Sequence, residues 1–133
     1  MKAKLLLILV GGFLLATVPA SAHHSFAAEF DVEKPVTLQG VLTKMEWVNP
    51  HGWLYIDVTQ PDGSVVNWAV EAGGPNALLR RGLRKTDFPL GLEIQVEGYA
   101  AKSGAPKANG QTVTLTDGRD FFLGVDDSGG GAR

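Results

Sequence analysis

Residues 53–71 read WLYIDVTQPDGSVVNWAVE, and this stretch decides the fold class. Its side chains alternate in character from Trp53 to Thr59 and again from Val65 to Glu71, which is the period of half-buried β-strands. The intervening PDG at 61–63 has the composition of a tight hairpin turn. The stretch therefore predicts two antiparallel strands joined by a short turn.

More strands are expected on both sides of this hairpin. One precedes it at Val36–Val48, with Gly40 inside it, where the chain can coil sharply or form a bulge. The NPHG sequence at 49–52 contains strong breakers and predicts a loop. Three strands are expected after the hairpin, at Glu93–Tyr99, Thr112–Thr116 and Asp120–Leu123.

The segment between the third and fourth predicted strands favours a helix. Pro75 suits its first position and Gly82 suits the residue that ends it, so about two turns fit. Residues 85–90 are expected to form a loop. Residues 102–110 read KSGAPKANG and are predicted to be a polar, turn-rich connection.

The predicted order is strand, strand, strand, short helix, strand, strand. In a domain of this size, that order indicates an all-β fold, a small OB-like Greek-key barrel of five to six strands with one short helix between strands 3 and 4. A plain β-sandwich is the alternative.

Residues 1–22 have the three-part layout of a secretory signal peptide. Two lysines give a basic start, an apolar run of 14 residues follows at Leu5–Val18, and small residues precede a cleavage site after Ala22. The run is too short to cross a hydrocarbon core about 30 Å thick. We therefore expect a periplasmic protein and no integral membrane segment.

Removing this leader leaves 111 residues with a net charge of −4, because it takes away two lysines and no acidic residue. The chain contains no cysteine, which excludes disulfides, thiolate metal sites and a cysteine nucleophile. A chain of this length supports one hydrophobic core. We predict a single domain at 23–125 that opens with an ordered arm at 23–35, and a disordered tail at 126–133.

Four segments resemble a known family. They are AHHSF at 22–26, EWVNPHGW at 46–53, NWAVE at 67–71 and GGPNALLRRG at 73–82. Together they resemble an uncharacterised family of short secreted proteins of Gram-negative bacteria, a domain of unknown function. The resemblance covers nearly all of the mature chain. It implies an exported all-β domain and assigns no functional residue.

The three histidines, His23, His24 and His51, are the predicted metal ligands. Cleavage after Ala22 would give His23 a free α-amine beside its imidazole, and His24 adds a second imidazole. Nitrogen donors in tetragonal geometry suit Cu(II), so copper is the candidate cofactor. If His51 in the 49–52 loop folds beside the amino terminus, it completes a three-nitrogen site known as a histidine brace.

Two other interpretations of the histidines are open. Cleavage after Ala20 would put His23 in third position, where its imidazole joins the terminal amine and backbone amides around Cu(II) or Ni(II). In a metal-free protein, His23 and His24 would be polar residues of the arm, and His51 would hydrogen-bond its own loop.

Aromatic residues form the second candidate site. OB-type barrels bind oligomers on the face of strands 2 and 3, where Trp53, Tyr55 and Asn67 are the predicted ligand contacts. The alternative is that Trp68 and at least one other tryptophan fill the core, because a small domain without disulfides needs bulky core residues.

These patterns predict a binding or accessory module and not an enzyme. No serine lies in a nucleophile-elbow sequence, and a copper oxidase or monooxygenase is the one enzymatic interpretation kept. The expected partner is a periplasmic protein or a small ligand, because a negative charge and export argue against nucleic acid. The competing hypothesis is a metal-free structural or protein-interaction domain.

Overall fold

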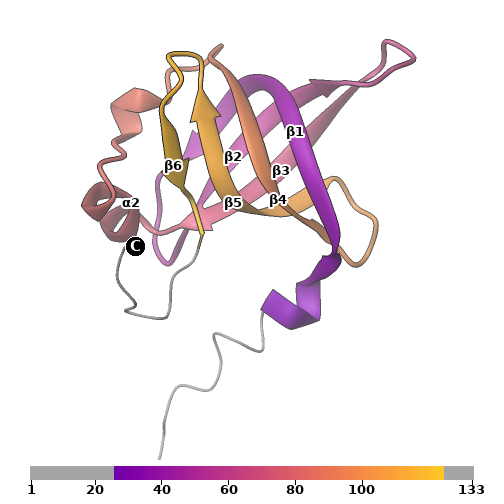
Figure 1. Cartoon of the computed structure of the whole chain (residues 1–133), viewed down its shortest axis with the longest axis horizontal. Helices are drawn as coiled ribbons and strands as arrows, with labels where there is room; N and C mark the ends of the chain where they lie inside the picture. Colours follow the sequence, from indigo (N-terminus) through magenta and orange to yellow (C-terminus); the bar gives the residue numbers. More distant parts are fainter. Residues whose placement is uncertain (1–25, 125–133) are drawn as a thin grey trace, which may run out of the picture.

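The computed structural model describes residues 26–124, which form six strands and two short helices after a helical turn at 26–29 (Figure 1). The strands are β1 (Phe30–Glu46), β2 (His51–Thr59), β3 (Val65–Gly73), β4 (Glu93–Ala101), β5 (Lys107–Leu115) and β6 (Asp120–Phe122). Between β3 and β4 lie the helix α2 (Pro75–Arg80) and the 3-10 helix η1 (Lys85–Asp87), the latter in a segment predicted to be a loop.

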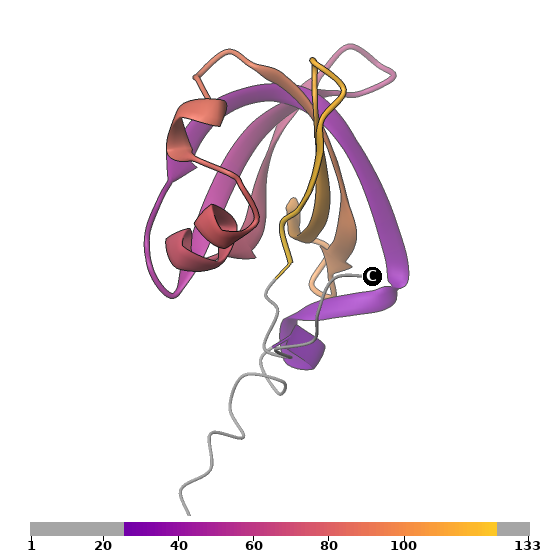
Figure 2. The same ribbon diagram turned by 60° about the vertical axis from the view of Figure 1, so that its left-hand side comes forward.

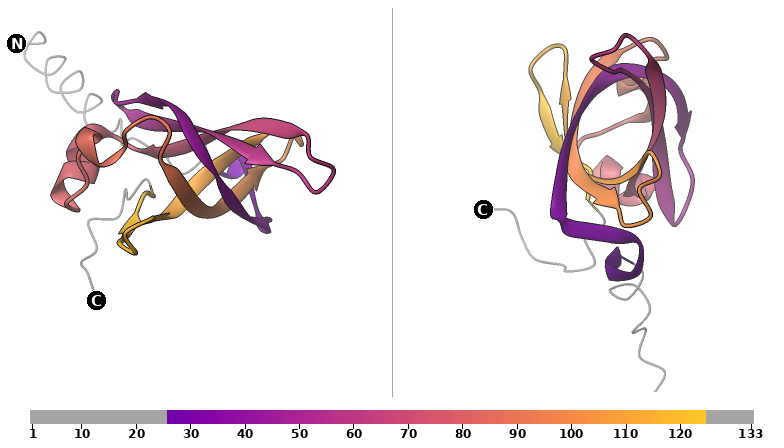
Figure 3. Two further views of the ribbon diagram at one scale, coloured as in Figure 1. Left: turned by 90° about the horizontal axis from the view of Figure 1, so that it is seen from above. Right: turned by 90° about the vertical axis from the view of Figure 1, so that its right-hand side faces the viewer.

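Pairing of five strands closes a barrel. β1 is antiparallel to both β2 and β4, β2 is antiparallel to β3, and β4 is antiparallel to β5. A parallel pairing of β3 with β5 completes the ring, which the right-hand view of Figure 3 shows end-on. β6 pairs with β5. The predicted OB-like barrel with its helix between strands 3 and 4 is therefore confirmed, and the sandwich alternative is wrong.

The first strand reaches both sides of the barrel because it coils. β1 pairs with β4 up to Val41 and with β2 from Val41 onward. A Cβ added at Gly40 would lie 2.2 Å from the backbone oxygen of Asp57, so only a residue without a side chain permits this approach. Gly40 thus lies next to the point where β1 changes partners, whereas the irregularity of register falls between Leu42 and Lys44.

The core lies inside the barrel and is closed at one end by α2. The alternation of the hairpin is confirmed, since Leu54, Ile56 and Val70 are fully buried on the inner face. Leu78 of α2 joins the same cluster. Trp47 and Trp68 also pack against it, so two tryptophans serve the core, as the alternative interpretation proposed.

Three predicted boundaries are wrong. β2 begins at His51, so His51 and Gly52 belong to a strand and not to the loop predicted at 49–52. β1 begins at Phe30, so residues 30–35 belong to a strand and not to an N-terminal arm; Phe30 is 2% exposed and pairs with Ala101. β5 begins at Lys107, within the segment predicted as a turn-rich connection. Pairing with β3 and β4 outweighs the turn-like composition of residues 107–110.

The predicted signal peptide at 1–22, His23, His24 and the tail at 126–133 lie outside the described residues. Within residues 26–124, no helix has the length and apolar character needed to cross a membrane.

Candidate functional site

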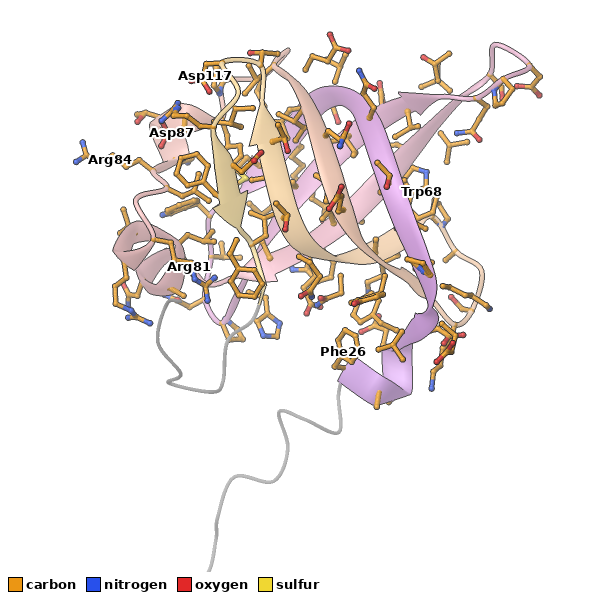
Figure 4. The ribbon with its side chains drawn as sticks, viewed as in Figure 1. Phe26, Trp68, Arg81, Arg84, Asp87 and Asp117 are labelled. Atoms are coloured by element: carbon orange, nitrogen blue, oxygen red, sulfur yellow. The ribbon has the colours of Figure 1, made fainter. Side chains whose placement is uncertain are left out.

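One end of the barrel gathers segments that are distant in the sequence. The turn at 26–29, the loop at 47–50 and the β4–β5 loop all lie along the lower edge of the barrel in Figures 1 and 2, with the 47–50 loop to the left, beside α2. Phe26 marks this end in Figure 4. The polar residues of β2, β3 and β5 that lie nearest this end form the candidate site.

His51 and Glu71 are the central pair of the site. His51 opens β2, and its Nδ1 lies 3.6 Å from Oε1 of Glu71 on β3. Glu71 is on the outer side of the sheet, because its neighbours Val70 and Ala72 enter the core. It is nevertheless only 8% exposed. A half-buried imidazole therefore stands beside a buried carboxylate.

A chain of amide groups fixes the Glu71 carboxylate. Asn109 pairs with Glu71 across the parallel β3–β5 contact, and its Nδ2 donates to Glu71 Oε1 at 3.3 Å. Gln111 Nε2 donates to Asn109 Oδ1 at 2.5 Å. Asn109 is 3% exposed, so this network is largely shielded from solvent.

Opposing effects act on the Glu71 carboxyl. Burial raises the pKa of Glu71, because removal from water penalises the charged form. The charges of His51 and Lys107 and the hydrogen bond from Asn109 lower the pKa, and the nearby negative charge of Glu29 raises it. The net direction is upward, with burial as the largest cause.

Residues 26–30, which we call the N-terminal anchor, are tied to this end of the barrel. Lys107 of β5 forms an ion pair with Glu29, and its Nζ lies 4.9 Å from the ring centroid of Trp53. The Lys102 backbone N–H donates to the Glu29 carbonyl oxygen at 2.8 Å. Further contacts join Lys102 Nζ to the Ala27 carbonyl, and the Phe26 ring to Phe30 and Tyr99.

The predicted contacts Trp53, Tyr55 and Asn67 share the outer face of the β2–β3 hairpin. Both rings are half-buried, and each has a lysine ammonium over it: Lys107 over Trp53, and Lys44 over Tyr55 at 5.0 Å. Asn67 donates to Asp57 Oδ1 at 2.8 Å. A ligand that stacked on this face would have to accommodate both lysine side chains.

The structure brings one of the three predicted metal ligands into the site. Within residues 26–124, no three histidine, cysteine, aspartate or glutamate side chains are grouped so that they could hold a metal ion. Further donors for a metal at His51 would have to come from outside residues 26–124, where His23 and His24 are the remaining histidines. Because residues 26–29 form a helical turn, only the three-residue step from His23 to Phe26 can extend freely, and it spans up to about 10 Å.

Lys107, Asn109, Glu29 and Glu71 were not predicted from the sequence to be site residues. Lys107 and Asn109 lie in the part of β5 whose composition resembles a turn, and Glu29 lies in the segment predicted as an ordered N-terminal arm. The sequence contains one indication that Glu71 is buried. This glutamate falls between Val70 and Ala72, followed by two glycines, a context with little else polar.

Comparison with known proteins places the chain in a family. No curated protein matches the sequence. The model of a family described as "Family of unknown function (DUF6152)" matches residues 12–111, a range that includes His51, Glu71 and Asn109. The resemblance to a domain of unknown function is thereby confirmed, and the chain belongs to the DUF6152 family.

Proposed function

We propose that the protein is an exported, periplasmic OB-like binding module that holds Cu(II) through its mature N-terminus and His51. The observation that carries this proposal is the N-terminal anchor. Residues 26–30 are held at the barrel end that carries His51, and cleavage after Ala22 would leave His23 three residues before the anchor begins. The terminal amine and imidazole would then start from a fixed point near His51.

The chemistry of the barrel end also favours a cation. The three proposed donors at His23 and His51 are nitrogens, which suit Cu(II), and the Glu71 carboxyl lies beside the His51 ring. Metal affinity should weaken as the pH falls, because amine and imidazole donors must lose their protons to bind.

We propose binding and not catalysis, so we assign no catalytic residue. The outer face with Trp53, Tyr55 and Asn67 remains a proposed secondary contact surface for a small ligand or a protein partner. Its two lysines favour ligands with anionic groups over neutral ones.

The test uses the full chain expressed with its own leader and recovered from the periplasm. Intact mass identifies residue 1, elemental analysis measures bound copper, and EPR during a Cu(II) titration reports the donor atoms. We expect one Cu(II) per chain with nitrogen donors and a dissociation constant below about 1 μM.

Two variants locate the donors. His51→Ala should weaken binding at least about tenfold, whereas Asn67→Ala, on the outer face of the same hairpin, should leave it unchanged. N-terminal acetylation should weaken binding as His51→Ala does. An unprocessed leader, or equal affinity in His51→Ala and the unmodified protein, would contradict the proposal and favour a metal-free interaction domain.

A further inference from the structure

We infer that Glu71 is a positioning residue, which accepts a hydrogen bond from Nδ1–H of His51 and leaves Nε2 as the nitrogen that faces a ligand. The identity of that ligand as copper rests on the proposed function. The orientation of the ring does not, and it can be measured on the metal-free protein.

The geometry indicates which nitrogen carries the proton. A neutral imidazole has one N–H donor and one bare acceptor nitrogen, and the nitrogen beside a carboxylate is the one that is protonated. In His51 that nitrogen is Nδ1, at 3.6 Å from Glu71 Oε1. A movement of about 0.5 Å by these side chains brings the pair to hydrogen-bond distance.

Glu71 can orient the ring because its own position is fixed. The same Oε1 accepts from Asn109, which in turn accepts from Gln111. The parallel β3–β5 pairing aligns Glu71 with Asn109, and both residues are buried. In the described part of the chain, no buried side-chain nitrogen or oxygen lacks a hydrogen-bond partner. The hydrogen-bonded network therefore ends at Glu71 Oε1, and His51 Nδ1 lies next to this oxygen at 3.6 Å.

A carboxylate in this place has a recognised consequence for metal binding. Histidines that bind metals usually donate their second ring N–H to a carboxylate or carbonyl, which fixes the ring and increases the basicity of the binding nitrogen. Loss of such a partner typically reduces metal affinity about 10- to 100-fold. Glu71, Asn109 and Gln111 would provide this support from β3 and β5.

NMR of the metal-free, full-length exported protein tests the orientation. Long-range ¹H–¹⁵N spectra of the neutral ring distinguish a protonated from a bare nitrogen, and His51→Gln identifies the signals of His51. We expect a protonated Nδ1 and a bare Nε2. Glu71→Ala and the size-conserving Glu71→Gln should both reduce this preference to a mixture of tautomers.

Asp57→Ala is the matched control, because Asp57 is an outer-face carboxylate of the same hairpin that binds Asn67. It should leave the His51 tautomer unchanged. Backbone amide spectra of each variant establish that the barrel is intact. A bare Nδ1 in the unmodified protein, or a tautomer unaffected in a folded Glu71→Ala protein, which lacks the acceptor, would overturn the inference.

A Cu(II) titration of the same variants separates this inference from the proposed function. If the unmodified protein fails to bind copper but shows the Glu71-dependent tautomer, the copper function is wrong and the orienting role of Glu71 holds. If copper binds through His51 with equal affinity in the folded Glu71 variants, the function holds and the positioning role is wrong.

Discussion

A single buried carboxylate, Glu71, dominates the electrostatics of the candidate site. Because burial raises its pKa, ionised Glu71 is less favourable in the folded chain than in the unfolded chain, where the ordinary value of 4.5 applies. Its contribution to stability is therefore fully present below pH 4.5 and is lost as the pH rises through the folded pKa.

The raised pKa of Glu71 predicts how the stability of Glu71→Gln should depend on pH. The neutral amide carries no penalty for ionisation, so the stability of the variant relative to the unmodified protein should increase between about pH 4.5 and pH 7. Urea unfolding at a series of pH values measures the difference. Asp62→Asn is the control of opposite sign, because hydrogen bonds from Ser64 lower the pKa of Asp62. Parallel curves of unfolding free energy against pH for the unmodified protein and Glu71→Gln would contradict a raised pKa of Glu71.

Single residues also show which features of the structure can be predicted from the sequence. Alternation places Leu54 inside and Trp53 outside, because each side chain in a strand points opposite to its neighbours. The same rule puts Glu71 on the outer face but says nothing of its burial. Glu71 is hydrogen-bonded by Asn109, 38 residues away in the sequence, and local periodicity carries no information about that contact.

Among the elements, β1 shows a steric requirement of barrel closure, the close approach of Gly40 to the backbone of Asp57. Gly40→Ala should destabilise the protein by about 1–3 kcal/mol, because the new methyl group collides with backbone at Asp57. Thr37→Ala, at an exposed position of the same strand, should change stability by about 0.5 kcal/mol or less. Urea unfolding of both variants tests this, and equal midpoints would show that β1 can relax at Gly40.

Adjacent leucines in α2 offer a second matched pair. Leu78 is fully buried in the core cluster, whereas Leu79 is 49% exposed. Leu78→Ala should cost about 2–5 kcal/mol, and Leu79→Ala should cost less than about 1 kcal/mol, since both changes alter helix propensity equally. Thermal and urea unfolding compare the two. Similar losses would mean that α2 does not close the core as described.

Strands, helices and turns could be predicted where the residues that determine them lie close together in the sequence. The hairpin turn and the start of α2 at Pro75 both follow from nearby residues. The start of β5 at Lys107 does not, because residues 107–110 become a strand by pairing with β3 and β4 on either side. Turn-like composition and strand structure conflict there, and tertiary pairing decides.

Across the whole molecule, the N-terminal anchor joins the beginning of the described chain to the barrel end that carries His51. Ring contacts of Phe26, the Lys102 backbone bond and the Lys107–Glu29 ion pair hold it. Lys107 also lies over Trp53, two residues from His51. This lysine therefore connects the anchor with the strand that opens at the candidate metal ligand.

Lys107→Met should loosen the anchor without unfolding the barrel. It removes the ion pair to Glu29 but keeps an apolar side chain of similar length, so hydrogen exchange of residues 26–29 should become about two- to fivefold faster. Lys85→Met is the control, because Lys85 is exposed in η1, and Arg84 and Asp87 on either side of it lie far from Phe26 in Figure 4. Exchange followed by mass spectrometry compares the two. Equal exchange in both variants would show that Lys107 does not hold the anchor, and the proposed copper site would then lose the fixed point from which its N-terminal donors start.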